Sequence, residues 1–478
     1  MTEKIIIALD QGSSASRAVA ITRGGAVLAK EIIPVSLRVN GAECDYDAQD
    51  LLSTQINALD KIIAANLGQI TAIAVCAQRS TIVMWDKTTG KALGPALSWL
   101  DGRAASIAAQ NPLTQDEIHS RTGLYKTPYY SAPKIKWCLQ NFPAAQEVLA
   151  KGNLLCGPVA SWLIWHMTGG KIFAADITNA QRTLLFNIKT MDWDNDILKS
   201  FAIPREILPQ ILPSAADYGS YKDIPITVCV GDQQAAAAAT GLLKQGDCSI
   251  NYGTGAFALL NIGQMPVDIP GILTSVAFNT AKQKNDFILE GPVNAAGSLF
   301  TWLNSVGLDF DARDLDNIAA VSKTPAQVYP ALGGIGAPLW DFSVMPVLTG
   351  LKPNTSKADI VAGTMRGLCF FVADIVNYIN KAGFTAERVQ ASGGLAASAA
   401  LLKFQSAVLQ RPIIRAKETE TAALGAAYIS ALNAGIDTSS WQAFKNYEVF
   451  EPEIPSREAA ELYASWRAFA DWALKQPK

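Results

Sequence analysis

Two blocks of the sequence share one pattern, in which a short apolar run ends at a small polar turn and a second apolar run follows directly. The first block spans Lys4–Thr22 and turns at 10–14, and the second spans Cys248–Ile262 and turns at 253–255. β-Rich runs on both sides of a glycine-containing turn are typical of β-hairpins. Because the blocks resemble each other in kind, although not residue by residue, we expect two similar halves with a boundary near Thr240–Gln245.

Strand and helix patterns alternate along the rest of the chain. Apolar residues on one face predict a helix over Asp50–Leu67, and a strand follows at Ile70–Cys76. In mid-chain, Ile226–Val230 predicts a buried strand and Gln233–Leu243 an Ala-rich helix. A last helix, over Ser456–Lys475, follows a proline and is expected to be capped by its first residue. This alternation favours an α/β protein over an all-α or all-β one.

The composition indicates a folded protein with ample apolar surface. Of 478 residues, 49% are hydrophobic and 17% charged, which excludes disorder as the main state. Lys plus Arg (40) nearly balance Asp plus Glu (42), so nucleic acid and anionic membrane surfaces are not expected partners. The apolar run at the start is too short for a signal peptide. The uncharged stretch Gly152–Gly170 is too polar to span a membrane, so we expect a buried helix there and no membrane insertion.

Cysteine and histidine usage narrows the possible site classes. The seven cysteines are scattered and form no Cys-x-x-Cys pair. An odd number without a framework favours buried, reduced thiols in a cytoplasmic protein. The only histidines, His119 and His166, lie far apart, which nearly excludes a zinc site of several histidines and leaves few candidates for a Ser-His-Asp triad.

The first turn, Asp10–Ser14, is one candidate for chemistry. Its glycine permits a tight turn, and the Ser13 and Ser14 hydroxyls with neighbouring N–H groups suit phosphate oxygens. Asp10 is a candidate ligand of Mg²⁺, and Arg17 is close enough in sequence to reach a phosphate. An ordinary hairpin turn would use the same residue types, so this segment alone leaves both interpretations open.

The second turn, around Thr254, matches the pattern Gly-x-Gly-x-x-Ala of dinucleotide-binding loops. That loop should open a helix, whereas the residues after Gly255 read as a strand, and Pro266 and Pro270 argue against a helix further on. We therefore reject a Rossmann interpretation and keep two others, a phosphate-facing turn and a plain hairpin. The sequence also lacks a Walker loop and the His-Arg-Asp and Asp-Phe-Gly motifs of protein kinases.

Two further segments lie where a predicted strand gives way to a helix. Asp232 follows the strand Ile226–Val230, and strand ends are where α/β sheets bind ligands. A carboxylate there can accept a proton from a substrate hydroxyl, although an Asp N-cap would look the same. The segment Ala391–Ser398 contains consecutive glycines, which allow a ring or a phosphate to approach, or simply form a loop.

Taken in order, these segments resemble the FGGY family of carbohydrate kinases, and within it the glycerol kinase branch most closely. Each segment alone is moderately specific, but chance is a poor explanation for all of them in the family's order. The resemblance extends over nearly the whole chain. The segments that carry it are Ile7–Arg17, Tyr129–Trp137, Asp176–Thr183, Leu185–Ile188, Gly231–Ala236, Tyr252–Gly255 and Thr421–Tyr428.

The resemblance implies an α/β fold of the actin-like (ribonuclease H-like) ATPase type, with two domains and a cleft between them. Residues 1–240 would bind the polyol or sugar and carry the first phosphate loop, and residues 241–478 would bind the nucleotide. ATP is then the phosphoryl donor, with Mg²⁺ at Asp10. The nucleotide contacts implied by motif are Ser13, Ser14, Arg17, Thr254, Gly297, Thr301, Gly394 and Ser398. Two of them, Thr301 and Ser398, stand where the glycerol kinase branch has the longer Gln and Asn.

The resemblance also implies a substrate site. Asp232 would be the catalytic base, and Trp99 and Phe257 would enclose the carbon skeleton. Polar groups beside an apolar wall suit a polyol, although without the motifs these aromatics would be read as core. The implied substrate residues are Arg79, Ser80, Trp99, Tyr129, Asp232, Gln233 and Phe257.

One of these residues departs from the glycerol kinase pattern. Ser80 stands where that branch has a Glu that accepts hydrogen bonds from two substrate hydroxyls. Loss of a charged acceptor costs about 1.5–3 kcal/mol if nothing replaces it. The sequence therefore predicts either weak glycerol binding or a larger polyol or sugar.

The expected activity is transfer of the γ-phosphoryl group of ATP to a hydroxyl of a small polyol or sugar, with glycerol the leading candidate. The alternative within the class is a kinase for xylulose, ribulose or a longer polyol. ATP-driven chaperones and filament proteins share this fold but lack a polyol pocket, and a degenerate kinase that only binds sugar would not need Asp10, Asp232 and Thr254. The expected partner is the small substrate, with a homo-oligomer possible.

Overall fold

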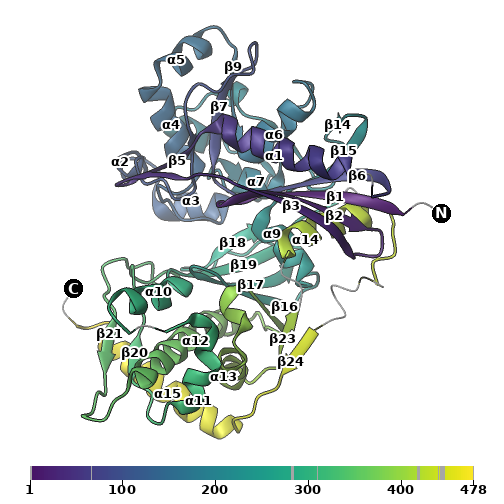
Figure 1. The fold of residues 1–478 in the computed structure, drawn as a ribbon. Coiled ribbons are helices and arrows are strands. Elements are labelled where there is room, and N and C mark those ends of the chain that lie inside the picture. Colours follow the sequence, from purple (N-terminus) through teal and green to yellow (C-terminus); the bar gives the residue numbers. More distant parts are fainter. Residues whose placement is uncertain are drawn as a thin grey trace.

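The computed structural model describes residues 3–65, 67–280, 285–308, 310–416, 420–439, 441 and 447–476. They form two α/β units, one above the other in Figure 1. The upper unit contains mostly the N-terminal half of the chain, in purple to teal, and the lower unit mostly the C-terminal half, in teal to yellow.

A six-stranded sheet forms the centre of the N-terminal unit. In spatial order its strands are β14 (Ser220–Tyr221), β15 (Ile224–Gly231), β6 (Gln69–Ala77), β1 (Lys4–Gln11), β2 (Ala15–Thr22) and β3 (Val27–Pro34). The neighbours β15, β6 and β1 are parallel, whereas β2 pairs antiparallel with both β1 and β3. The predicted hairpin at the start of the chain is thus confirmed. Strand β1 is buried from its second residue onward, as expected of a strand covered on both faces.

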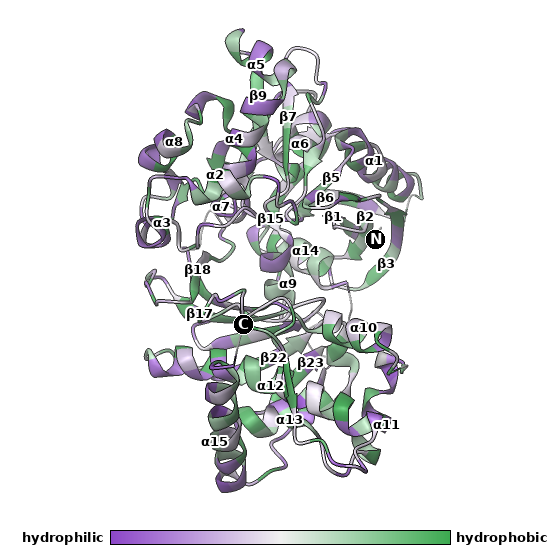
Figure 2. Ribbon diagram, turned by 90° about the vertical axis from the view of Figure 1, so that its left-hand side faces the viewer, coloured by the Kyte–Doolittle hydropathy of each residue, from purple (hydrophilic) through white to green (hydrophobic). Residues whose placement is uncertain are grey.

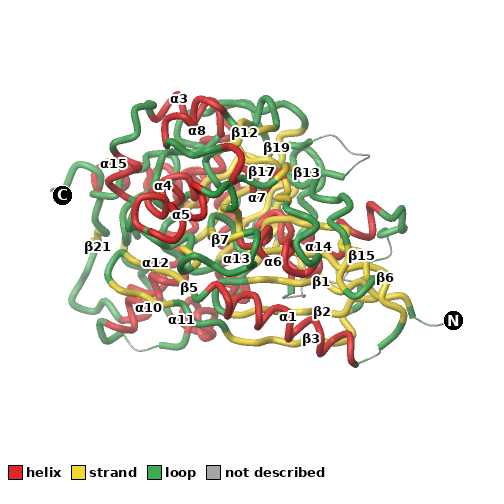
Figure 3. The backbone as a smooth tube through the Cα atoms, turned by 90° about the horizontal axis from the view of Figure 1, so that it is seen from above, coloured by secondary structure: helices red, strands yellow, loops and turns green. Residues whose placement is uncertain are grey.

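The rest of the N-terminal unit surrounds a second sheet. Its five strands are, in order, β4 (Arg38–Asn40), β5 (Glu43–Tyr46), β8 (Ala96–Leu97), β7 (Ile82–Asp86) and β9 (Leu154–Pro158). Two small sheets pair β10 (Ala174–Asp176) with β13 (Gln210–Leu212), and β11 (Phe186–Asn187) with β12 (Asp192–Trp193). The helices are α1 (Ala48–Ala64), α2 (Ala105–Ala109), α3 (Gln115–Thr122), α4 (Ser131–Asn141), α5 (Pro143–Ala150), α6 (Val159–Met167), α7 (Ile177–Gln181), α8 (Asn195–Phe201) and α9 (Asp232–Ala239). Seen from above, α1 and α3 lie at opposite sides of the molecule (Figure 3).

The C-terminal unit is built on a seven-stranded sheet. Its order is β18 (Leu273–Val276), β19 (Phe287–Val293), β17 (Ala256–Gly263), β16 (Asp247–Tyr252), β22 (Arg388–Ser392), β23 (Ile413–Ala416) and β24 (Tyr447–Phe450). The predicted second hairpin is β16–β17. A two-stranded sheet pairs β20 (Gln327–Tyr329) with β21 (Val347–Thr349). The helices are α10 (Gly297–Ser305), α11 (Leu315–Val321), α12 (Lys357–Lys381), α13 (Ala399–Leu409) and α15 (Ser456–Ala473).

One helix from the C-terminal part of the chain packs on the N-terminal unit. Helix α14 (Thr421–Asn433) lies beside α9, next to the six-stranded sheet (Figure 1). The two helices approach so closely that a Cβ atom added to Gly425 would lie 1.7 Å from the carbonyl oxygen of Ala235. The N-terminal unit is therefore discontinuous in sequence, because residues far beyond the predicted boundary at 240 complete it.

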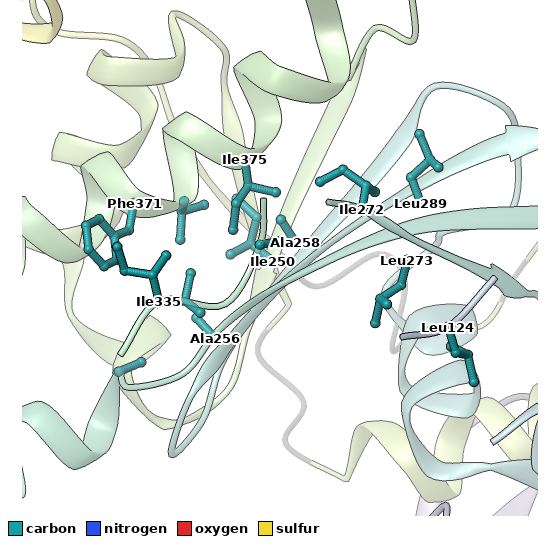
Figure 4. Close-up of a cluster of buried hydrophobic side chains, with 14 of the residues drawn as sticks. Leu124, Ile250, Ala256, Ala258, Ile272, Leu273, Leu289, Ile335, Phe371 and Ile375 are labelled. Carbon is teal, nitrogen blue, oxygen red and sulfur yellow. The ribbon is translucent and has the colours of Figure 1, made fainter. Parts of the chain in front are cut away.

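The hydrophobic core continues from one unit into the other. Leu124 of the N-terminal unit lies near Leu273 at the start of β18, and both belong to one buried cluster (Figure 4). The backbone N–H of Thr274 donates to the carbonyl of Gly123 (2.9 Å). A Cβ atom added to Gly123 would lie 1.9 Å from the carbonyl oxygen of Thr274. Only glycine permits this approach, so the two units are joined by close backbone packing at this point.

Two sequence expectations are wrong in detail. Gly152–Gly170 is a strand, β9, followed by the shorter helix α6, because Gly157-Pro158 ends the strand and α6 begins directly after the proline. Ser456 does not cap α15, since it is the first helical residue and its hydroxyl donates to Gln410 Oε1 (2.6 Å). The amphipathic character of α1 and α15 is confirmed, and hydrophilic and hydrophobic stretches alternate along both (Figure 2).

All seven cysteines are buried and unpaired, as predicted. Among the described residues, no helix is both long enough and apolar enough to traverse a bilayer.

Candidate active site

Three neighbouring parallel strands of the N-terminal sheet end at the same edge. Asp10 lies opposite Cys76 near the end of β1, and Gly231 at the end of β15 lies opposite Ala77 at the end of β6. Because parallel strands have their carboxyl ends at one edge, Asp10, Asp232 and Arg79 are brought together from positions far apart in the sequence. The structure thus joins the first turn, the Arg79 segment and the α9 segment.

Asp232 is the first residue of α9, directly after β15, as predicted. Its Oδ1 atom lies 3.5 Å from Nε of Arg79 and accepts the backbone N–H of Gln233 (2.7 Å). Burial raises the pKa of this carboxyl, while Arg79 and the Gln233 N–H act in the opposite direction. The side chain keeps 26% of its surface exposed. It is therefore an accessible carboxylate with increased basicity and a fixed orientation.

Asp10 lies in β1 rather than in the turn, which consists of Gly12, Ser13 and Ser14. Its Oδ2 atom lies 3.2 Å from Nη1 of Arg17 on β2, the residue opposite it in the strand pair. Burial raises the Asp10 pKa to about 6, Arg17 opposes this and the charge of Asp232 adds to it. The two carboxylates therefore influence each other across the strand ends.

The predicted polyol residues include two large aromatic side chains that remain well exposed, Trp99 and Tyr129, at 40% and 48%. The indole Nε1–H of Trp99 donates to Ser13 Oγ (2.9 Å), so the aromatic wall and the first turn are in contact. Gln233 and Phe257 are partly buried, the latter on β17 of the C-terminal unit. Exposed aromatics beside a polar strand edge are a suitable surface for the C–H face of a polyol.

Ser80 is buried and has a left-handed backbone conformation (φ 65°). Its hydroxyl donates to the carbonyl of Arg182 (3.0 Å), and its own carbonyl accepts from Ser131 Oγ (3.2 Å) and Lys134 Nζ (2.9 Å). Position 80 therefore offers no carboxylate acceptor, and its hydroxyl is occupied by the protein backbone.

A second pair of parallel strands positions the glycine turns of the C-terminal unit. Asn251 of β16 lies opposite Ser392 of β22, so the turns at 253–255 and 393–394 leave the sheet at one edge. Gly393 has φ 91°, and an added Cβ atom would lie 2.5 Å from the Tyr252 oxygen. Beside it, a Cβ atom on Gly394 would meet open space. This edge therefore presents backbone groups with little side-chain cover.

The remaining predicted nucleotide residues lie in the turn between β16 and β17, in α10 and at the start of α13. The Thr254 carbonyl accepts the N–H groups of Ala296 (2.8 Å) and Ser298 (3.1 Å), which ties the turn to the start of α10 at Gly297. The Thr301 hydroxyl donates to the Gly297 carbonyl (3.2 Å) within that helix. Ser398 caps α13, donating to Asp316 Oδ1 (2.6 Å) and accepting from the N–H of Leu401 (3.1 Å). The shortened side chains at 301 and 398 are thus hydrogen-bonded to the protein itself.

A buried charged network beside Asp232 was not predicted. Glu290 on β19 forms an ion pair with Arg182 and lies 3.8 Å from Nη1 of Arg79, and Ser275 Oγ donates to it (3.0 Å). Burial raises the pKa of Glu290, but the two arginines and the hydrogen bonds outweigh this, so the net shift is downward. Glu290 comes from the C-terminal unit and both arginines from the N-terminal one. The only sequence signal was an acidic residue within the apolar run Phe287–Val293.

The described residues contain no group of three or more His, Cys, Asp or Glu side chains arranged to hold a metal ion. Asp10 is nevertheless a suitable ligand for Mg²⁺, since that ion is usually held by one or two carboxylates together with the phosphate oxygens of the substrate. A metal that arrives with a nucleotide therefore fits this donor set.

Solved structures with the same architecture are two-domain kinases. Glycerol kinase of Plasmodium falciparum, solved with ADP, superimposes with a TM-score of 0.94 at 26% identity over 99% of each chain. Xylulose kinase of Lactobacillus acidophilus superimposes with a TM-score of 0.86 at 21% identity over 99% of each chain, which supports the fold alone. The expected actin-like ATPase fold is confirmed, and the chain is a phosphotransferase of that class.

The sequence matches identify the family. Residues 5–239 match the N-terminal domain, and residues 248–434 the C-terminal domain, of the FGGY family of carbohydrate kinases. A glycerol kinase of Pseudothermotoga lettingae is 36% identical over 98% of both chains, and one of Rhodopirellula baltica 34% identical over 98% of this chain and 90% of its own. The chain belongs to the FGGY family of carbohydrate kinases and is an enzyme that phosphorylates an alcohol group, with ATP as its co-substrate.

Proposed function

We propose that this enzyme transfers the γ-phosphoryl group of ATP to glycerol, forming glycerol 3-phosphate and ADP. The observation that carries the proposal is the pairing of Arg79 with Asp232, the first residue of α9. The chain is also similar along its length to proteins named glycerol kinase. The similarity to the xylulose kinase structure, at 21% sequence identity, supports the fold only.

Asp232 acts as the general base in this proposal. The acceptor hydroxyl lies against its carboxylate, and Arg79, 3.5 Å away, orients the carboxylate from the other side. Gln233 hydrogen-bonds a second hydroxyl, while Trp99 and Phe257 cover the C–H face. Since phosphoryl transfer has a loose transition state, positioning and electrostatic stabilisation supply most of the rate.

The ATP phosphates would lie between the two glycine edges. Ser13, Ser14 and Arg17 would contact them from the N-terminal unit, and Thr254 and Gly394 from the C-terminal one. The nucleoside part would contact Gly297 through its backbone. It would contact Thr301 and Ser398 through their backbones or after a rotamer change, because the hydroxyls of these two residues are hydrogen-bonded to the protein. Asp10 would hold Mg²⁺, which when bound neutralises phosphate charge.

A panel of acceptors tests the proposal. The purified enzyme is assayed with ATP, Mg²⁺ and glycerol, ribitol, xylulose or ribulose, with ADP release as the readout and EDTA as the metal control. We expect the highest kcat/KM with glycerol and loss of turnover with EDTA. Turnover of the other acceptors without glycerol turnover would refute the glycerol assignment.

One observation favours a second candidate, a kinase for a longer polyol or a ketopentose. Ser80 places no carboxylate in the site, and its hydroxyl is held by the Arg182 carbonyl (3.0 Å). A substrate that does not need this acceptor would lose less binding energy than glycerol. The same panel separates the two candidates.

Two further expectations concern the enzyme's surroundings. The unpaired cysteines support a cytoplasmic location, where thiols stay reduced. Exposed apolar side chains such as Phe342, Met345 and Leu351 (55–59% exposed) support a homo-oligomer. Fractionation of the source cells and light scattering after gel filtration measure these two properties.

A further inference from the structure

Lys134 is a fully buried lysine that the proposed mechanism does not use. It lies in the first part of α4, and its relative exposure is 0%. Burial lowers the pKa of its ammonium to about 7, with Asp101 opposing this. Since burying an ammonium group is costly, its position needs an explanation in the contacts that it makes.

The ammonium group donates to three backbone carbonyls, those of Ser80 (2.9 Å), Ser98 (2.8 Å) and Tyr129 (2.8 Å). An ammonium has three N–H donors, so the three acceptors match it one for one. None of the three carbonyls belongs to the body of α4. They come from the segment after β6, the segment after β8 and the segment just before α4.

Each of these carbonyls adjoins a residue of the proposed polyol site. Ser80 and Tyr129 belong to that set themselves, and the Ser98 carbonyl is in the peptide group that leads to Trp99. The Trp99 N–H in turn donates to Thr81 Oγ1 (3.1 Å), which links the first two segments a second time. One buried side chain therefore connects three segments that carry substrate residues.

We propose that Lys134 is a positioning residue that fixes the relative placement of Ser80, Trp99 and Tyr129, and thereby determines the affinity for the acceptor. The proposal rests on the proposed location of the acceptor site, but not on the identity of the acceptor. Lys134 is too deeply buried to contact the acceptor, so its effect is transmitted through the three backbone segments.

The test is Lys134→Met, which keeps an unbranched apolar side chain one atom shorter and removes the three donors. The assay uses whichever acceptor of the panel the wild-type enzyme prefers, so a failure of glycerol as substrate counts against the proposed function only. We expect acceptor kcat/KM to fall about 10- to 100-fold, mainly through KM, with the ATP KM unchanged within about twofold.

Lys126→Met is the matched control. The Lys126 ammonium also donates to loop carbonyls, those of Asn111 (3.2 Å) and Leu113 (2.8 Å), but these adjoin no proposed site residue. Its kinetic constants should stay within about twofold of the wild type. Equal effects of the two variants, or equal rises of the acceptor and ATP KM in Lys134→Met, would show a general structural role and overturn the proposal.

A second variant keeps the proposal testable if Lys134→Met folds poorly, and hydrogen exchange keeps it testable if no acceptor is turned over. Ser131→Ala removes the second donor to the Ser80 carbonyl (3.2 Å) and should raise the acceptor KM about two- to fivefold. The Trp99 amide donates to Thr81 Oγ1 (3.1 Å), so its hydrogen exchange should become at least about tenfold faster in Lys134→Met or, if that variant does not fold, measurably faster in Ser131→Ala. Unchanged exchange at this amide would overturn the proposal.

Discussion

Glu290→Gln tests the buried network that links the two units beside the catalytic carboxylate. The substitution keeps the shape of the side chain but removes the negative charge opposite Arg182 and Arg79. All three side chains are at least 88% buried: the exposed fraction is 3% for Glu290, 4% for Arg182 and 12% for Arg79. Two guanidinium groups would then share a buried site in which one counter-charge has been lost.

The magnitude follows from this burial. Breaking a buried ion pair by removing one partner costs about 3–5 kcal/mol, because the remaining charge is left uncompensated. At about 2.1 cal/mol/K per residue, unfolding of 478 residues as one unit has an entropy of about 1 kcal/mol/K. Tm should therefore fall by about 3–5 °C, or by about twice as much if one unit unfolds on its own.

Differential scanning calorimetry at pH 7 measures this, with Glu461→Gln as control. Glu461 forms a solvent-exposed pair with Arg457 (67% and 92% exposed), whose loss should change Tm by less than about 1 °C. The pKa of Glu290 is lower in the folded than in the unfolded state. Its contribution to the free energy of unfolding is therefore complete above the unfolded-state pKa of about 4.3, and it is lost as the pH falls through the folded-state pKa. The gap between wild type and Glu290→Gln should thus shrink only below about pH 4. A Glu290→Gln Tm within 1 °C of wild type at pH 7 would refute the reasoning.

Three other substitutions give independent tests. Asp232→Asn should lower kcat about 10²–10⁴-fold at unchanged Tm in the ADP-release assay, and a loss below about tenfold would remove Asp232 from the role of base. Ser80→Glu should lower the glycerol KM about tenfold or more relative to Ser80→Ala by restoring a charged acceptor, and a higher KM would contradict our interpretation of this position. Gly425→Ala places a Cβ atom 1.7 Å from the Ala235 oxygen and should destabilise the α9–α14 contact by about 1–3 kcal/mol or more, measured by urea denaturation. Unaltered stability would mean that α14 can move away freely.

Local patterns predicted the elements that carry the candidate site. Alternating apolar runs and turn residues predicted β1, β2, β16 and β17, and the change from strand to helix at Asp232 was predicted to within one residue, although α9 ends at Ala239 rather than at Leu243. The motif order predicted the fold class. The failures were of a different kind, since neither the strand in Gly152–Gly170 nor the missing cap at Ser456 has a distinctive local signal.

Contacts between distant segments could not be predicted from these patterns. The hydrogen bond of Ser398 depends on Asp316, 82 positions away, and the packing of α14 on α9 depends on how the chain returns to the first unit. The roles assigned to the site residues stay predictions, which the variants above address.

By itself, the amino-acid sequence determined the succession of strands, turns and helices, and the residues that lie at the ends of those strands, because hydrophobic periodicity and turn chemistry are local. Only the tertiary structure decided which strand ends are neighbours, that Glu290 lies against two arginines of the other unit, and that Lys134 is surrounded by three carbonyls. The contact between Arg79 and Glu290 joins residues more than 200 positions apart, and that between Lys134 and Ser80 joins residues more than 50 apart. The energies of such contacts depend on burial and distance. Neither quantity exists until the chain has folded.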